Sequence, residues 1–134
     1  MKKIDQNKIM CSEWFQSLRN KICNEIEALE ESTNKFKRKK WSRDPNGLKN
    51  MGGGEMSVLR GKTFEKAGVN ISTVFGRIST SLKGKIPGTN DYNKFWASGI
   101  SVVIHPFSPK IPAVHMNTRH IITKESWFGG GMDI

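Results

Sequence analysis

The sequence has 134 residues, of which 36% are hydrophobic, enough for one modest domain. Its net charge of +10 favours an anionic partner: a nucleic acid, an acidic membrane surface or a polycarboxylate small molecule. No apolar run approaches ~18 residues and none follows Met1-Lys2-Lys3, so we expect neither a membrane span nor a secretory signal. Cys11 and Cys23 lie roughly 18 Å apart on one predicted helix, too far for a disulfide, which favours a cytoplasmic protein.

Residues 5–31 have the periodicity of a single amphipathic helix. Its large apolar residues recur at three- and four-residue steps and therefore form one face. They are Phe15, Leu18, Ile22, Ile26 and Leu29. So wide an apolar face favours packing on a sheet over binding to a membrane or a partner. We assign residues 1–34 to this helical segment.

Residues 35–55 are predicted to be a basic, glycine-rich linker. Lys35–Arg43 interleaves cations with Phe36 and Trp41, a pattern that could also grip a phosphate backbone and stack on bases. A solvated linker is the more usual cause of such a charge run. Asp44–Gly47 is a turn signal, and Gly52–Gly54 continue the flexible connection.

From residue 56 to residue 134 the pattern is typical of a β-sheet. Short stretches rich in Val, Ile, Phe, Ser and Thr are separated by glycine. We predict strands at 56–59, 63–65, 69–75, 100–105 and 113–123, with a polar connector at 83–94. One helix followed by hairpin-linked strands predicts an α+β fold with an antiparallel sheet, in a single domain over residues 1–134.

The two predicted strands on either side of the proline-rich loop carry the clearest functional pattern. Alternation places Ser101 and His105 on one face of the first strand, and His115, Asn117 and Arg119 on one face of the second. If the strands pair as a hairpin, these side chains form one polar patch. Arg119 suits carboxylate capture, and the histidines can exchange protons or bind a metal. The ordinary water-facing side of a half-exposed sheet is the alternative interpretation.

Four motifs, in order along nearly the whole chain, carry a resemblance to a known family. Trp41, Arg43 and Gly52–Gly54 are similar to a W-x-R…GGG segment, and residues 64–76 match FEKAGVN-x-S-x-V-x-G. Residues 97–119 follow the family's order from ASGISVVIHP to HMNTR, and residues 127–133 resemble its WWFGGG-x-D motif. On these residues the chain resembles the oxygen-dependent coproporphyrinogen oxidases.

The resemblance implies a function, a fold and a set of site residues. The activity is oxidative decarboxylation of coproporphyrinogen III to protoporphyrinogen IX in haem biosynthesis, with dioxygen as co-substrate and no required cofactor. The fold is an antiparallel sheet flanked by helices, assembled as a homodimer. His115 matches the proton donor. Substrate-binding positions match Ser101, Asn117, Thr118 and Arg119, and His105 with His115 match ligands of a possible divalent metal.

Departures from the family pattern leave other functions open. Phe107 and Ser108 replace the Arg-Asn that many members have, and Ser126 replaces the first tryptophan of WWFGGG. The chain ends at Ile134, where the family continues, so we predict a truncated, amino-terminal half of the domain. The alternatives are a catalytically inactive remnant that binds porphyrinogen or a partner, and a small basic nucleic-acid-binding protein, with nucleic acid the less favoured partner.

Overall fold

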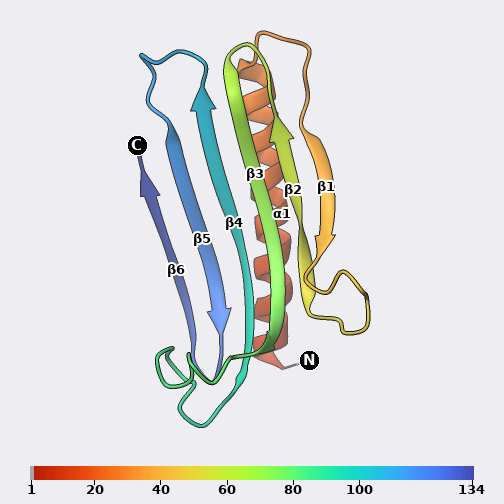
Figure 1. The fold of residues 1–134 in the computed structure, drawn as a ribbon, viewed down its shortest axis with the longest axis vertical. Coiled ribbons are helices and arrows are strands. Elements are labelled where there is room, and N and C mark those ends of the chain that lie inside the picture. The colour runs from red at the N-terminus through yellow and green to blue at the C-terminus, as the bar shows by residue number, and fades with distance from the viewer. Residues whose placement is uncertain (1) are drawn as a thin grey trace.

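The computed structural model describes residues 2–134 and consists of one helix packed on a six-stranded sheet (Figure 1). The elements are α1 Lys3–Leu29, β1 Lys37–Ser42, β2 Gly52–Leu59, β3 Phe64–Arg77, β4 Lys94–Pro106, β5 Val114–Ile122 and β6 Ser126–Asp133. Strands adjacent in sequence are adjacent in the sheet, and every pair is antiparallel. The predicted α+β class is therefore confirmed. Within residues 2–134, no helix has the length and apolar character needed to cross a bilayer.

Helix α1 covers one face of the sheet, chiefly over β3 and β4 (Figure 1). Its buried residues are Phe15, Arg19, Cys23 and Ile26. Leu18 and Ile22 are partly buried against the same core, so the predicted apolar face is confirmed at every position except Leu29. Leu29 is 67% exposed. Arg19 can lie on the buried face of the helix because it forms an ion pair with Glu55 of the sheet.

Glu30 ends the helix and attaches it to the turn between β2 and β3. Its carboxylate accepts hydrogen bonds from the backbone N–H groups of Ser32, Lys62, Thr63 and Phe64, at 2.7–3.2 Å. Burial raises the pKa of this carboxyl, but the four donors outweigh it and hold the pKa at about 2. The predicted helix end at residue 31 was two residues late, because Glu30 serves the turn.

We expect Glu30→Gln to lower the melting temperature by several degrees at pH 7, because an amide replaces the charged acceptor. A carboxyl with a depressed folded-state pKa stabilises the fold above its ordinary pKa of 4.5, and that contribution is lost as the pH falls to about 2. The deficit of the variant should therefore shrink across this window. Thermal unfolding followed by circular dichroism measures it. Glu31→Gln is the matched control, and an equal effect there would contradict the account.

The segment 35–55, predicted as a linker, instead contains β1 and the start of β2. β1 pairs with β2 from Lys37↔Val58 to Ser42↔Gly53. The glycines permit close strand contact: a Cβ added at Gly54 would lie 2.9 Å from the Trp41 ring. Strand β1 was missed because all six of its residues are exposed, so no apolar alternation marks it.

Two further strand predictions need correction. The stretches predicted at 63–65 and 69–75 form the single strand β3, because Gly68 stays within the ladder, opposite Val103. β6 was not predicted, because glycines at 129–131 remove the side chains that make strand alternation visible. The predicted strands at 56–59, 100–105 and 113–123 lie within or nearly coincide with β2, β4 and β5.

Candidate functional site

The predicted hairpin between β4 and β5 is present, in the register needed for a shared polar patch. Ser101 pairs with Asn117, Val103 with His115, and Gly99 with Arg119. Directly paired residues point to the same side of an antiparallel sheet. The alternate residues Ile100 and Val102 are buried in the α1 core. The patch therefore lies on the sheet face turned away from α1, which we call the open face.

Three side chains on the open face form a hydrogen-bonded chain. His115 Nδ1 lies 2.8 Å from Asp133 Oδ1, and His115 Nε2 lies 2.9 Å from His105 Nε2. Asp133 reaches this place because β6 pairs with β5 so that it stands opposite His115. Both side chains of the ion pair are accessible, at 47% for His115 and 74% for Asp133.

The donor and acceptor roles in this chain depend on the tautomers of the two histidines, which an ionised Asp133 would set as follows. An ionised Asp133 can only accept, so His115 Nδ1 carries the hydrogen that binds it. The Nε2 atom of a neutral His115 then accepts the N–H of His105. Taking up a proton at His115 Nε2 reverses that last bond while the bond to Asp133 strengthens. His115 is therefore oriented on one side and able to exchange a proton on the other.

Arg119 lies on the same face of β5 as His115, and its neighbours on the two adjacent strands are glycines, which we call the glycine floor. It stands between Gly99 on β4 and Gly129 on β6, and its Nη2 donates to Asn117 Oδ1 at 3.4 Å. A Cβ at Gly99 would lie 2.9 Å from the Cβ of Arg119. The Arg119 side chain is exposed, so its planar fork is available to an anion.

We expect Gly99→Ala to destabilise the fold by about 1–3 kcal/mol, because the new methyl group forces β4 and β5 apart. Gly129→Ala is the matched control. Gly129 faces the same arginine from the other side, and a Cβ there meets nothing within 4 Å. Urea unfolding of both variants makes the comparison, and equal midpoints would contradict this account of the glycine floor.

The predicted substrate-binding residues do not all share the open face. Ser101, Asn117 and Arg119 do, and Ser101 and Arg119 line a hollow of about 230 Å³ together with Asn70 and Ser72. Thr118 pairs with Ile100, so its side chain points to the α1 side of the sheet. The resemblance alone assigned Thr118 to the site, and the structure separates its side chain from the other three.

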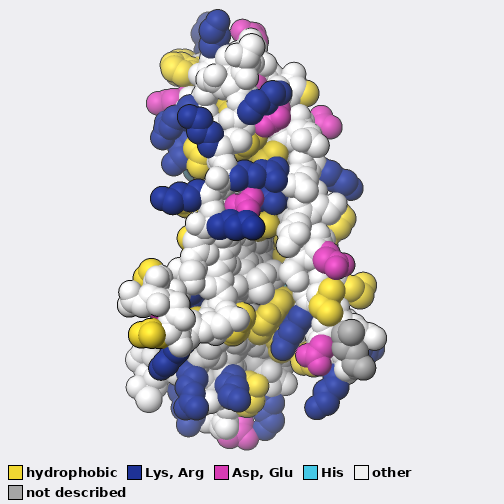
Figure 2. Space-filling view, turned by 90° about the vertical axis from the view of Figure 1, so that its right-hand side faces the viewer, with side chains coloured by type: hydrophobic (Ala, Val, Ile, Leu, Met, Phe, Trp, Pro, Cys, Tyr) yellow, Lys and Arg dark blue, Asp and Glu magenta, His cyan; other side chains and the backbone are white. Residues whose placement is uncertain are grey.

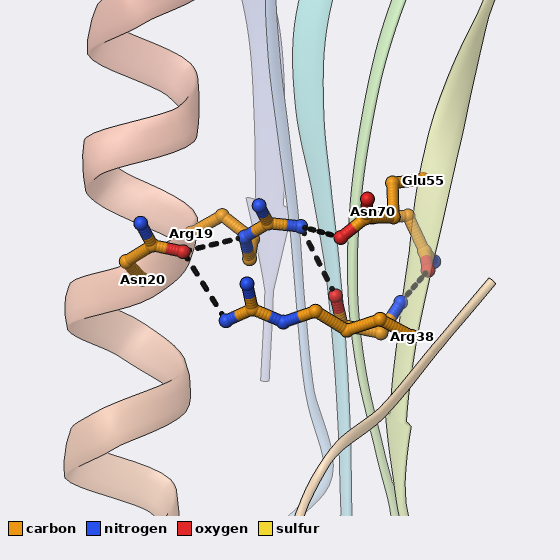
Figure 3. A network of polar contacts seen from close by, with 6 residues as sticks. Arg19, Asn20, Arg38, Glu55 and Asn70 are labelled. Atoms are coloured by element: carbon orange, nitrogen blue, oxygen red, sulfur yellow. Dashed lines mark hydrogen bonds and ion pairs between the residues drawn. The ribbon is translucent and has the colours of Figure 1, made fainter. Parts of the chain in front are cut away.

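A polar network on the α1 side of the sheet reaches Asn70 of the open face through one backbone hydrogen bond (Figure 3). Arg19, 6% exposed, donates from Nη1 to Glu55 at 2.9 Å and to Ser57 Oγ at 3.3 Å. The backbone N–H of Ser57 in turn donates to Asn70 Oδ1 at 3.3 Å. Oδ1 is therefore the bound atom of the Asn70 amide, and Asn70 borders the hollow together with Ser101.

The donor set available to a metal is small. His105 and His115 supply two imidazole nitrogens, but His115 already uses its other nitrogen on Asp133. Among residues 2–134 no group of three or more His, Cys, Asp or Glu side chains converges as a metal site would. The residues described here therefore do not form a metal site by themselves.

Cations dominate the β1 edge of the sheet, across the sheet from the site (Figure 2). The view onto the β1 edge shows Lys and Arg side chains far outnumbering Asp and Glu (Figure 2). Two lysines lie in the strand pairings: Lys39 of β1 is opposite Met56 of β2, and Lys66 of β3 is opposite His105 of β4. A field of this sign attracts a multiply charged anion to the open face.

Sequence reasoning missed Asp133 and Asn70. Asp133 could have been found only by pairing β6 with β5, and the glycine run hid β6. From the sequence, Asn70 was recognised only as part of a motif. The pairing of β3 with β4 places it opposite Ser101. Both residues join the patch through strand register, which no local pattern encodes.

Comparison with known proteins places the chain in a family. Residues 10–134 match the family model described as Coproporphyrinogen III oxidase. The chain is 48% identical to proteins named oxygen-dependent coproporphyrinogen-III oxidase from Rickettsia bellii and Rickettsia africae, over 96% of this chain and 47% of each relative. A protein of that name from Rickettsia felis is 47% identical over the same shares.

The fold and the site together define an α+β domain whose sheet carries histidine, arginine and asparagine side chains on its open face. The chain belongs to the coproporphyrinogen III oxidase family. It spans about half the length of the curated relatives that it matches.

Proposed function

We propose that this chain takes part in the oxygen-dependent oxidative decarboxylation of coproporphyrinogen III to protoporphyrinogen IX, a step of haem biosynthesis. The observation that carries the proposal is the open-face patch, in which Arg119 shares one face of β5 with the Asp133–His115–His105 chain in a member of this family. Ser101 and Asn117 supply neutral hydrogen-bonding groups between them.

The chemistry asks for the groups that the patch contains. In each of two propionates, a C–H bond at the carbon attached to the ring and the bond to the carboxylate carbon both break, carbon dioxide leaves, and a C=C bond forms in the side chain. Two electrons and two protons pass to dioxygen, which balances the reaction as vinyl, carbon dioxide and hydrogen peroxide. Arg119 holds and orients the carboxylate. His115 exchanges the proton on the adjacent pyrrole, and Asp133 holds its imidazole in the required tautomer.

Dioxygen is the co-substrate in this proposal, and no redox cofactor is required. His105 and His115 offer a divalent metal only two ligands, and their Nε2 atoms lie 2.9 Å apart. No step is therefore assigned to a metal. The homodimer implied by the family resemblance and the cytoplasmic location predicted from the cysteines remain part of the proposal.

Turnover by the purified chain tests the proposal. We expect vinyl product from coproporphyrinogen III under air and none under nitrogen, separated by chromatography. Circular dichroism at the same concentration establishes that the chain is folded. A folded chain that binds coproporphyrin III without forming product would favour the inactive remnant. Salt-sensitive binding to DNA or RNA with no preference for porphyrins would favour the nucleic-acid alternative.

A further inference from the structure

A second pocket on the open face lies next to the patch, under the connection between β3 and β4. Its floor is a cross-strand row of Val74, Ala97 and Ile121, and its roof comes from the connection itself. The roof residues are Ile78, Leu82 and Ile86. The cavity measures about 450 Å³, within the usual range for a small-molecule site.

The roof is tied to the sheet at both ends. The backbone N–H of Ile78 donates to the carbonyl of Asn93 at 2.8 Å, which closes the base of the connection. The Thr123 hydroxyl donates to the Pro87 carbonyl at 2.7 Å. The connection therefore runs across the lower end of the sheet towards the β5–β6 turn (Figure 1). The pocket beneath it is built by contacts between segments far apart in the sequence.

Arginines stand at the mouth of this apolar pocket. Arg119 lines it as well as the patch, so the two hollows are continuous. Arg43, just beyond the end of β1, lies with its guanidinium carbon 5.1 Å from the centre of the Phe95 ring, and its Nη1 donates to the Phe75 carbonyl at 3.1 Å. These two contacts orient the guanidinium and leave its other nitrogens for an anion.

We infer that this pocket binds a second carboxylate-bearing pyrrole ring of the tetrapyrrole, with the ring on the Val74–Ala97–Ile121 floor and its propionate on Arg43. The inference rests on the proposed function, in which Arg119 holds the propionate that reacts. Arg43 lies at Phe95 and Arg119 lies opposite Gly99, and these two positions of β4 are roughly 14 Å apart along the strand. That separation suits two carboxylates on different rings of one molecule. An apolar pocket with a cationic rim matches an apolar ring that carries an anionic arm.

Binding of coproporphyrin III, a stable stand-in for the substrate, tests the inference by fluorescence titration of the whole chain. We expect Arg43→Ala to weaken binding by roughly 10- to 100-fold, the size of a lost charge-assisted contact. Arg43→Lys should fall between, because it keeps the charge and loses the fork. Arg60→Ala, at the opposite end of the sheet, removes the same charge and should change nothing.

A second variant and a second ligand guard against a merely structural effect. Leu82→Asp places an anion in a roof position that is 47% exposed, and should weaken binding without unfolding the chain. The tetramethyl ester of coproporphyrin III lacks the carboxylates, so Arg43→Ala should leave its affinity unchanged. Equal losses for acid and ester would overturn the carboxylate contact.

The possible outcomes distinguish a failure of the second subsite from a failure of the proposed function. If Arg119→Ala weakens coproporphyrin binding while Arg43→Ala and Leu82→Asp do not, the second subsite is wrong and the proposed function stands. If the folded wild-type chain does not bind coproporphyrin III, both are overturned. Losses in all three variants, with the Arg60→Ala control unchanged, support the pocket as the second subsite.

Discussion

Arg119→Ala should weaken coproporphyrin III binding by about 10- to 150-fold. A hydrogen-bonded charge contact contributes about 1.5–3 kcal/mol, and a factor of ten corresponds to about 1.4 kcal/mol. The loss should be large because the guanidinium of Arg119 is free to bind the ligand. The two neighbours of Arg119 across the sheet are Gly99 and Gly129, and its contact with Asn117 is long, at 3.4 Å. No other arginine borders both hollows of the open face among the residues lining them.

Arg119→Lys and Arg60→Ala are the informative comparisons for this variant. A lysine keeps the charge but cannot make a bidentate contact, so we expect an intermediate affinity. Arg60→Ala lowers the net charge equally at a distant turn, so it controls for the general field of the protein. If both alanine variants lose the same affinity, the attraction comes from net charge and the assignment of Arg119 is wrong.

His115→Ala should abolish proton exchange and lower the turnover rate by about 10²- to 10⁴-fold, the range for removing a general acid or base. Binding of coproporphyrin III should change much less, because the carboxylate contact belongs to Arg119. The variant therefore separates the rate constant from the affinity. Steady-state kinetics under air, with chromatographic detection of the vinyl product, provides the measurement.

Asp133→Asn tests whether the carboxylate orients His115. The amide can donate to Nδ1 and so favours the other tautomer, whose Nε2–H meets the N–H of His105 across 2.9 Å. We expect a turnover rate between those of wild type and His115→Ala, with binding retained. Asp5→Asn, in the first turn of α1, removes the same charge away from the site. Wild-type turnover in Asp133→Asn would contradict the positioning role.

The β4–β5 hairpin and its patch could be predicted because they are local. Ser101, His105, His115, Asn117 and Arg119 lie in two alternating segments joined by a short loop, and alternation alone assigns their faces. The α+β class followed from the same patterning. The resemblance then added roles that alternation cannot supply, including that of Thr118, which borders the hollow while its side chain lies on the opposite face.

The elements that escaped prediction depend on distant partners. All residues of β1 are exposed, and the strand is held by its pairing with β2. Three of the eight residues of β6 are glycine, so only its register with β5 shows which face each residue takes. Arg19 of α1 faces the core because Glu55 of β2 neutralises its charge. The position of Arg43 over Phe95 likewise joins residues far apart in the chain.

The central claim is that the open face, and not the α1 side of the sheet, binds the tetracarboxylate. A titration of the ¹⁵N-labelled chain with coproporphyrin III, followed by amide and side-chain NMR signals, tests it most directly. The account predicts shifts at Asn70, Asn117 and Arg119 and at the roof over 78–86, with α1 unchanged. Shifts confined to α1, or to the cations of β1 at 37–40, would contradict it.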